Sequence, residues 1–233
     1  MKPILFNTEM VKAILDGRKT ATRRLVKPIP PENARLELIG DRRCAMDLSI
    51  EIPGPDDHRI YTPPFLPGDI LYVRETWQYG GPLDGNDQVI EPCQYYYAAD
   101  GDPFDRWLND DGSYHDGMKW HPSIHMPKEA ARIFLRVTDV RVERLQEITA
   151  ADCEKEGAAR IYNPIIREDH ETYAAYCRKE FSRVWNSTLK HMDHIRYGWS
   201  ANPWVWVIEF ERCEKPKENG KQGGGERYGG ADG

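Results

Sequence analysis

The sequence contains no apolar run long enough to span a membrane, and its first ten residues lack the apolar core of a signal peptide. Its cysteines are odd in number, scattered and never spaced as CxxC; they are Cys44, Cys93, Cys153, Cys177 and Cys213. These absences argue against a disulfide-rich secreted protein. We therefore expect reduced thiols in a cytoplasmic protein that does not contact membranes.

Several well-known catalytic and binding motifs are also missing. There is no glycine-rich phosphate loop and no GxSxG elbow, so triphosphatase and serine hydrolase functions have no support. His121 and His125 are four residues apart, but Pro122 and Pro127 oppose a helix there, and no cysteine lies close by. His191 and His194 form the other spaced pair. We expect neither a metal nor another cofactor.

The composition is that of a globular protein with a moderate acidic excess. The chain has 233 residues, 39% of them hydrophobic and 11% aromatic, with seven tryptophans. Its net charge of −6 argues against a protein that coats nucleic acid by bulk electrostatics, although a local basic patch can bind one phosphate or a short strand.

Hydrophobic periodicity predicts short strands separated by helices, without a repeated βαβ pattern. The predicted strands are 4–6, 36–39, 48–52, 70–73, one within 79–118 near Tyr95–Tyr97, 133–145 and 204–210. The predicted helices are 8–16, one that starts at Thr149 and ends at Gly157, and 168–185. This pattern favours an α+β fold built around a small β-barrel.

One segment, 16–24, has an unusual density of cations. It follows the first predicted helix directly and contains Arg18, Lys19, Arg23 and Arg24, with the hydroxyls of Thr20 and Thr22 between them. No acidic residue occurs between Gly17 and Pro31. A helix that stops and delivers a lysine, a threonine and two arginines is suited to holding an anion or activating a nucleophile.

The order of several segments resembles the ASCH family of the PUA-like superfamily, in its longer phage-type subgroup. The matching segments are 17–24, 67–77, 122–127, 137–157 and 204–210. The resemblance implies a single PUA-like barrel domain over 1–213, flanked by helices. It further implies insertions at about 28–63, 79–116 and 160–200, and a disordered tail at 214–233.

The resemblance implies two functions. Small ASCH proteins are amidohydrolases of N4-acetylcytidine and related amides. By position, Thr22 would be the nucleophile, Lys19 the base and Glu156 the acid. Other PUA-like proteins bind RNA, so the alternative is a module that binds RNA or a modified nucleotide without catalysis. The predicted partner is thus a small nucleoside-like substrate or RNA.

Further candidate binding residues are Arg18, Arg23, Arg24, Glu75 and Trp77. Glu75 and Trp77 follow a predicted buried strand, and Trp77 is a candidate for stacking on a base. Each candidate also has a structural interpretation: solvated cations, carboxylate-paired arginines, a strand threonine, a surface glutamate or a core tryptophan. The catalytic interpretation requires a turn or bulge near Thr20 and Ala21, because Lys19 and Thr22 point to opposite faces in a regular strand.

Overall fold

The structure is a computed structural model. It describes residues 1–28, 35–39, 47–51, 58–82, 86, 88, 93–102, 106–108, 112–117, 119–158 and 170–216. Most of the predicted disordered tail at 214–233 lies outside the described residues.

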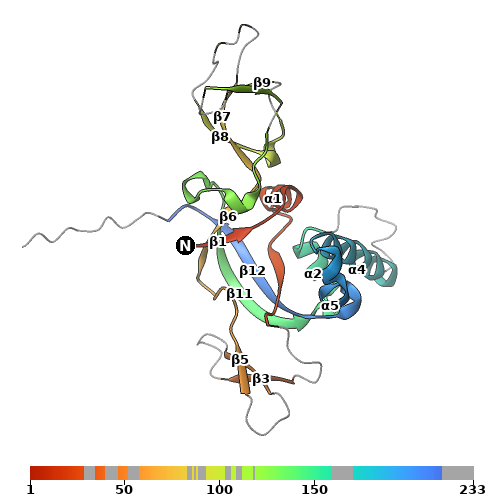
Figure 1. Ribbon diagram of the computed structural model, residues 1–233. Coiled ribbons are helices and arrows are strands. Elements are labelled where there is room, and N and C mark those ends of the chain that lie inside the picture. The colour runs from red at the N-terminus through yellow and green to blue at the C-terminus, as the bar shows by residue number, and fades with distance from the viewer. Residues whose placement is uncertain are drawn as a thin grey trace, which may run out of the picture.

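A five-stranded sheet forms the centre of the molecule (Figure 1). Its strands, in spatial order, are β1 (Lys2–Leu5), β6 (Ile70–Arg74), β11 (Phe134–Arg144), β12 (Trp204–Cys213) and β2 (Ala21–Leu25). β1 and β6 are parallel and the other neighbours antiparallel. β11 is a single strand with a register shift between Val137 and Asp139, and Figure 1 shows that it curves strongly together with β12.

The α+β prediction is confirmed, whereas closure into a barrel is not. Among the described residues, no strand pairing joins the outer strands β1 and β2. A side chain connects their ends instead, since Arg24 Nη2 donates to the carbonyl oxygen of Leu5 at 2.7 Å. The described sheet is therefore curved but open at this edge.

Alternation along β12 divides the core into two clusters. Trp206, Ile208 and Phe210 join the cluster that contains Val11 and Ile14 of α1 (Thr8–Leu15). Val205 and Val207 point to the opposite face, where they join the cluster formed with α2 (Ala150–Lys155) and α4 (His170–Ser187). Because successive side chains of a strand point to opposite faces, one strand serves both clusters.

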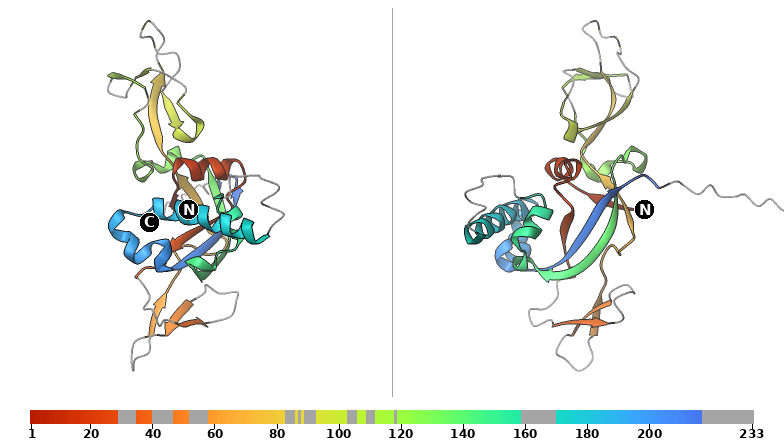
Figure 2. Two further views of the ribbon diagram at one scale, coloured as in Figure 1. Left: turned by 90° about the vertical axis from the view of Figure 1, so that its right-hand side faces the viewer. Right: turned by 180° about the vertical axis from the view of Figure 1, so that it is seen from behind.

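The helix ends follow from local sequence as predicted. Asn7 caps α1 by accepting a hydrogen bond from the amide of Met10, and Thr149 and Asp152 form a capping box on α2. Gly17 and Gly157, which follow the two helices, both have a φ of +73°. Figure 2 shows α2 and α4 together on one side of the central sheet, with α5 (His194–Tyr197) near them.

Two small sheets extend from opposite ends of the central sheet (Figure 1). One contains β3 (Arg35–Ile39), β4 (Asp47–Glu51) and β5 (His58–Tyr61). The other contains β7 (Trp77–Pro82), β8 (Gln94–Tyr97), β9 (Arg106–Leu108) and β10 (Tyr114–Asp116). The sequence predicted only one strand within 79–118. β9 and β10 have three residues each and leave almost no periodicity to detect, and β7 ends in Gly80, Gly81 and Pro82, which are typical of a turn. The three ranges expected to hold insertions contain these sheets, apart from the first residues of β7, together with α4 and α5.

Candidate functional site

Two helix ends meet at the centre of the candidate site. After α1, the amides of Arg18 and Lys19 both donate to the carbonyl oxygen of Ala13 at 2.9 Å, which turns the chain back across the helix end. Lys19 then forms an isolated β-bridge with Glu156, the residue that ends α2. The amide of Thr20 also donates to the carbonyl oxygen of Lys155 at 2.8 Å. The backbone thus brings Lys19 and Glu156 together, although they are 137 positions apart.

Lys19 and Glu156 form a buried ion pair. Their Nζ and Oε2 atoms are 2.6 Å apart, and their side chains are 0% and 6% exposed. Lys19 Nζ also donates to the carbonyl oxygens of Ala21, at 2.7 Å, and Glu156, at 3.0 Å. An ammonium has three donors, so every N–H bond of Lys19 has an acceptor within the protein.

Gly157 allows this close approach. A Cβ built on Gly157 would lie 3.0 Å from Cβ of Ala13 and 3.2 Å from Cβ of Lys19. Its positive φ also disfavours any residue with a side chain. A glycine is therefore required here both by the backbone conformation and by the space between α1 and α2.

Burial lowers the pKa of Lys19, with Glu156 opposing the shift and Arg24 and Arg23 adding to it. Desolvation is the largest cause, because it disfavours the ammonium more than repulsion by the two neighbouring arginines does. Arg18 is not among the causes.

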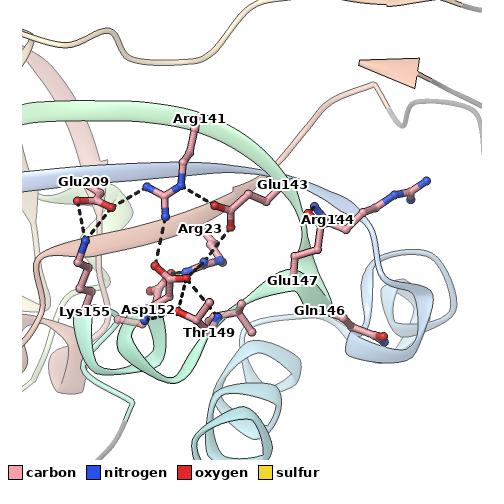
Figure 3. A network of polar contacts seen from close by, with 12 residues as sticks. Arg23, Arg141, Glu143, Arg144, Gln146, Glu147, Thr149, Asp152, Lys155 and Glu209 are labelled. Atoms are coloured by element: carbon pink, nitrogen blue, oxygen red, sulfur yellow. Dashed lines mark hydrogen bonds and ion pairs between the residues drawn. The ribbon is translucent and has the colours of Figure 1, made fainter. Parts of the chain in front are cut away.

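Arg23 connects the pair to acidic residues of β11 and α2, of which Figure 3 shows Glu143 and Asp152. Its side chain is fully buried and lies 3.3 Å from Glu156, 3.1 Å from Glu143 of β11 and 3.5 Å from Asp152 of α2. Nε of Arg23 is buried without a hydrogen-bond partner in the described structure. Arg23 is therefore committed to internal carboxylates, as one of the two sequence-based interpretations proposed.

A second arginine, Arg141 of β11, holds these carboxylates from the outside (Figure 3). It contacts Glu143 at 2.5 Å, Asp152 at 3.2 Å and Glu209 at 2.6 Å. Lys155 reaches the same Glu209 at 3.0 Å. Positive and negative side chains thus follow one another inward. The partly exposed Arg141 contacts Glu143 and Asp152, these two contact Arg23, and Arg23 contacts Glu156.

A cavity of about 360 Å³ adjoins the ion pair, between α1, β2, the end of α2 and α4. The lining residues include Asn7, Met10, Thr22, Arg23, Arg24, Glu156, Phe181 and Trp185. A neighbouring cavity of about 400 Å³ shares Asn7, Met10 and Glu156 with it and adds Glu9 and Arg183. Lys19 lines neither cavity, whereas its partner Glu156 lines both.

Thr22 lies on β2, in register with Ile208 of β12, and it lines the first cavity. Its side chain forms no hydrogen bond within the described part of the chain, although the residue is only 3% exposed. The regular strand begins at Ala21, after the Lys19 bridge, so Lys19 and Thr22 do not belong to one regular strand. Thr22 and Glu156 therefore lie in the wall of one cavity.

Arg24 lines the same cavity but is bonded differently from Arg23. Its guanidinium donates a hydrogen bond to the Leu5 carbonyl oxygen at 2.7 Å and lies over the Phe6 ring, 5.3 Å from the ring centroid. Burial lowers the pKa of Arg24, and Glu156 opposes the shift. The two neighbouring arginines thus have different roles, which their adjacent positions in the sequence did not reveal.

The remaining predicted site residues lie elsewhere. Arg18 pairs with Asp16 at 2.8 Å on the surface. Glu75 is 1% exposed and accepts two hydrogen bonds from Arg132, at 3.0 and 3.1 Å, while Trp77 contacts the rings of Tyr95 and His121. None of the three lines either cavity near Glu156.

Sequence reasoning missed the residues that complete the site. It identified Asn7 and Asp152 only as parts of helix caps and gave no role to Glu143 or Arg141. The aromatic wall from α4, Phe181 and Trp185, was recognised only as a helical stripe. In each case the missing information is which distant segments become neighbours.

Within the described ranges, no group of three His, Cys, Asp or Glu side chains could hold a metal ion. The helices of the described residues include none that is both long and apolar enough to cross a membrane. Comparisons with family models, with curated proteins and with solved structures found no match to the chain.

Proposed function

We propose that the chain hydrolyses an amide bond of a small acylated nucleobase or nucleoside, such as N4-acetylcytidine, in the cavity beside the Lys19–Glu156 pair. The observation that carries the proposal is the unbonded Thr22 hydroxyl in the same cavity wall as the carboxylate of this buried pair. The proposal includes kinship with the ASCH family and its PUA-like fold.

In the proposed reaction, Thr22 Oγ1 attacks the amide carbonyl carbon. Its proton passes to the carboxylate of Glu156, and the same proton then goes to the leaving nitrogen as the C–N bond breaks. Water next hydrolyses the acyl ester on Thr22, with Glu156 again accepting and returning a proton. The products are the free acid and the unacylated base.

Lys19 acts in this proposal as the partner of Glu156. The family resemblance gives Lys19 the role of base, but its three N–H bonds are engaged and its ammonium lies behind the carboxylate. The Lys19–Glu156 pair therefore acts as one acid–base unit, in which Glu156 exchanges protons with the ligand. Lys19 orients the carboxylate and offsets its charge.

The cavity lining suits an aromatic ligand of nucleoside size. Phe181 and Trp185 supply ring surface, and the cavity of about 360 Å³ falls within the range of small-molecule sites, about 300–1,000 Å³. Stacking on an aromatic side chain contributes about 1–3 kcal/mol per base in single-stranded nucleic acid binding.

Binding of RNA along 18–27 without catalysis has less support. Arg18, Lys19 and Arg23 already pair with carboxylates, so they lack free charge for a row of phosphates. An RNA-binding module would still retard RNA in low-salt gels, with binding weakened by charge reversal at Arg24. If the chain does not retard RNA in these gels, RNA binding is refuted and the small-molecule function stands.

The test is release of acetate from N4-acetylcytidine by the purified chain. Thr22→Val should abolish release, because it removes the hydroxyl and nearly preserves the shape. Thr20→Val is the matched control, since Thr20 is an exposed threonine two positions away and should leave turnover unchanged. Turnover that survives in Thr22→Val would remove Thr22 from the mechanism, and no turnover of any N-acylated cytosine derivative by the wild type would refute the proposal.

A further inference from the structure

Arg24 is the one charged residue of the cavity lining for which the described structure gives no carboxylate partner within salt-bridge distance. Its hydrogen bond goes to an uncharged acceptor, the Leu5 carbonyl oxygen. Arg23, by contrast, has three carboxylate neighbours. A guanidinium has five N–H donors, so most of those on Arg24 remain available to a ligand.

The cavity lining also has a net positive charge. Arg23 and Arg24 are cationic and Glu156 is anionic, so the three sum to one positive charge. Glu156 is paired with Lys19 and Arg23, and Arg23 is paired also with Glu143 and Asp152, which leaves Arg24 as the charge of the lining without an ion pair in the described structure. A partly buried charge without a partner is costly, and an anionic ligand group would remove that cost.

The start of α1 adds a second favourable feature. Asn7, the N-cap of this eight-residue helix, lines the same cavity, and Leu5, the partner of Arg24, is two residues before it. Helix N-termini carry partial positive charge and attract anions. Arg24 and this helix end therefore contribute positive potential to the same part of the cavity wall.

We propose that Arg24 binds an oxyanion of the ligand, either a phosphate or a carboxylate. The proposal rests on the function proposed above and specifies its substrate class: an acylated nucleobase derivative that carries one anionic group, in preference to the neutral nucleoside. Arg24 is suited to this task because guanidinium binds carboxylate and phosphate through two parallel hydrogen bonds.

The first test compares cytidine 5′-monophosphate with cytidine by calorimetry. The wild type should bind the nucleotide about tenfold more tightly or better, as expected for a charge-assisted hydrogen bond. Arg24→Gln should remove this preference. Arg18→Gln is the matched control, because Arg18 lies outside the cavity and already pairs with Asp16, so the preference should persist. If Arg24→Gln does not fold, Arg24→Lys replaces it and should weaken the preference.

The second test distinguishes the two oxyanions. Thermal denaturation is followed while inorganic phosphate or acetate replaces chloride at constant ionic strength. An increase in Tm with phosphate that Arg24→Gln abolishes would identify phosphate as the ligand group, and the same result with acetate would identify a carboxylate.

The inference would be overturned if neither test showed an effect that depends on Arg24. None of these probes contains an amide, so the outcome does not depend on turnover. The inference can therefore fail while N4-acetylcytidine is still hydrolysed, and it can hold if hydrolysis is absent.

Discussion

Replacing Lys19 by methionine tests the central ion pair most directly. The substitution removes the ammonium but keeps the length of the side chain. Among the described residues, Glu156 would retain Arg23, at 3.3 Å, as its one ion-pair partner, and the carbonyl oxygens of Ala21 and Glu156 would each lose a donor. Removing one member of a buried ion pair costs about 3–5 kcal/mol.

We expect Lys19→Met to lower the free energy of unfolding by about 3 kcal/mol, at the lower end of that range, because Arg23 still compensates Glu156. For a chain of this size, the loss corresponds to a decrease in Tm of about 6–12 °C. The measurement is urea denaturation followed by fluorescence, with thermal denaturation in parallel.

Two further variants separate the ion pair from packing. Lys19→Met combined with Glu156→Gln removes the unpaired carboxylate, so the double variant should be more stable than Lys19→Met alone. Lys12→Met is the matched control. Lys12 forms only an exposed pair with Glu9, at 3.7 Å, and its loss should change stability by no more than about 0.5 kcal/mol. A loss below about 1 kcal/mol in Lys19→Met would refute the argument, since an ammonium bonded to water gives that result.

Three other predictions concern stability. Gly157→Ala should cost about 2–3 kcal/mol, because its Cβ meets a side chain of α1 at 3.0 Å, whereas Gly17→Ala has open space and should cost about 1 kcal/mol; equal losses in urea would contradict the steric argument. Burial raises the pKa of the Cys153 thiol from 9.0 to about 12, so the unfolded chain loses this proton first and stability should fall by about 1.4 kcal/mol per pH unit between those values. Cys153→Ala should remove that part of the slope in urea titrations from about pH 8.5 to 10.5, and an unchanged slope would count against the buried thiol. Arg132→Met leaves the buried Glu75 without its bidentate partner and should cost about 3–5 kcal/mol by thermal denaturation, partly restored by adding Glu75→Gln; a cost below about 1 kcal/mol would contradict the role of Arg132.

Local features of the fold were predictable from the sequence. The strand at 70–73, the helix caps at Asn7 and Thr149 and the helix-ending glycines all depend on neighbouring residues. Strand order was not predictable in the same way, because it depends on which distant segments bury each other. At the open edge next to β2, Arg24 bonds to the carbonyl oxygen of Leu5, a contact that the local pattern does not encode.

The candidate site was predictable only in part. The family resemblance singled out Lys19, Thr22 and Glu156, and the structure brings Lys19 into contact with Glu156 and places Thr22 beside the same cavity. The sequence analysis treated Arg23 and Arg24 alike, as candidate binding residues. Their partners differ, because Glu143 of β11 and Asp152 of α2 lie beside Arg23. Glu75 was predicted to border the site, but its partner Arg132 is 57 positions away and holds it elsewhere.

The pairing of β2 has a consequence for how the chain reaches its native state. Among the described residues, β12 is the only sheet neighbour of β2, and it begins at Trp204. Thr22 and both arginines of β2 are therefore synthesised long before β12, and they acquire their hydrogen-bonded neighbour only when that strand is complete. A ribosome-bound chain that ends before 204 should lack the cavity, however well its earlier elements have formed.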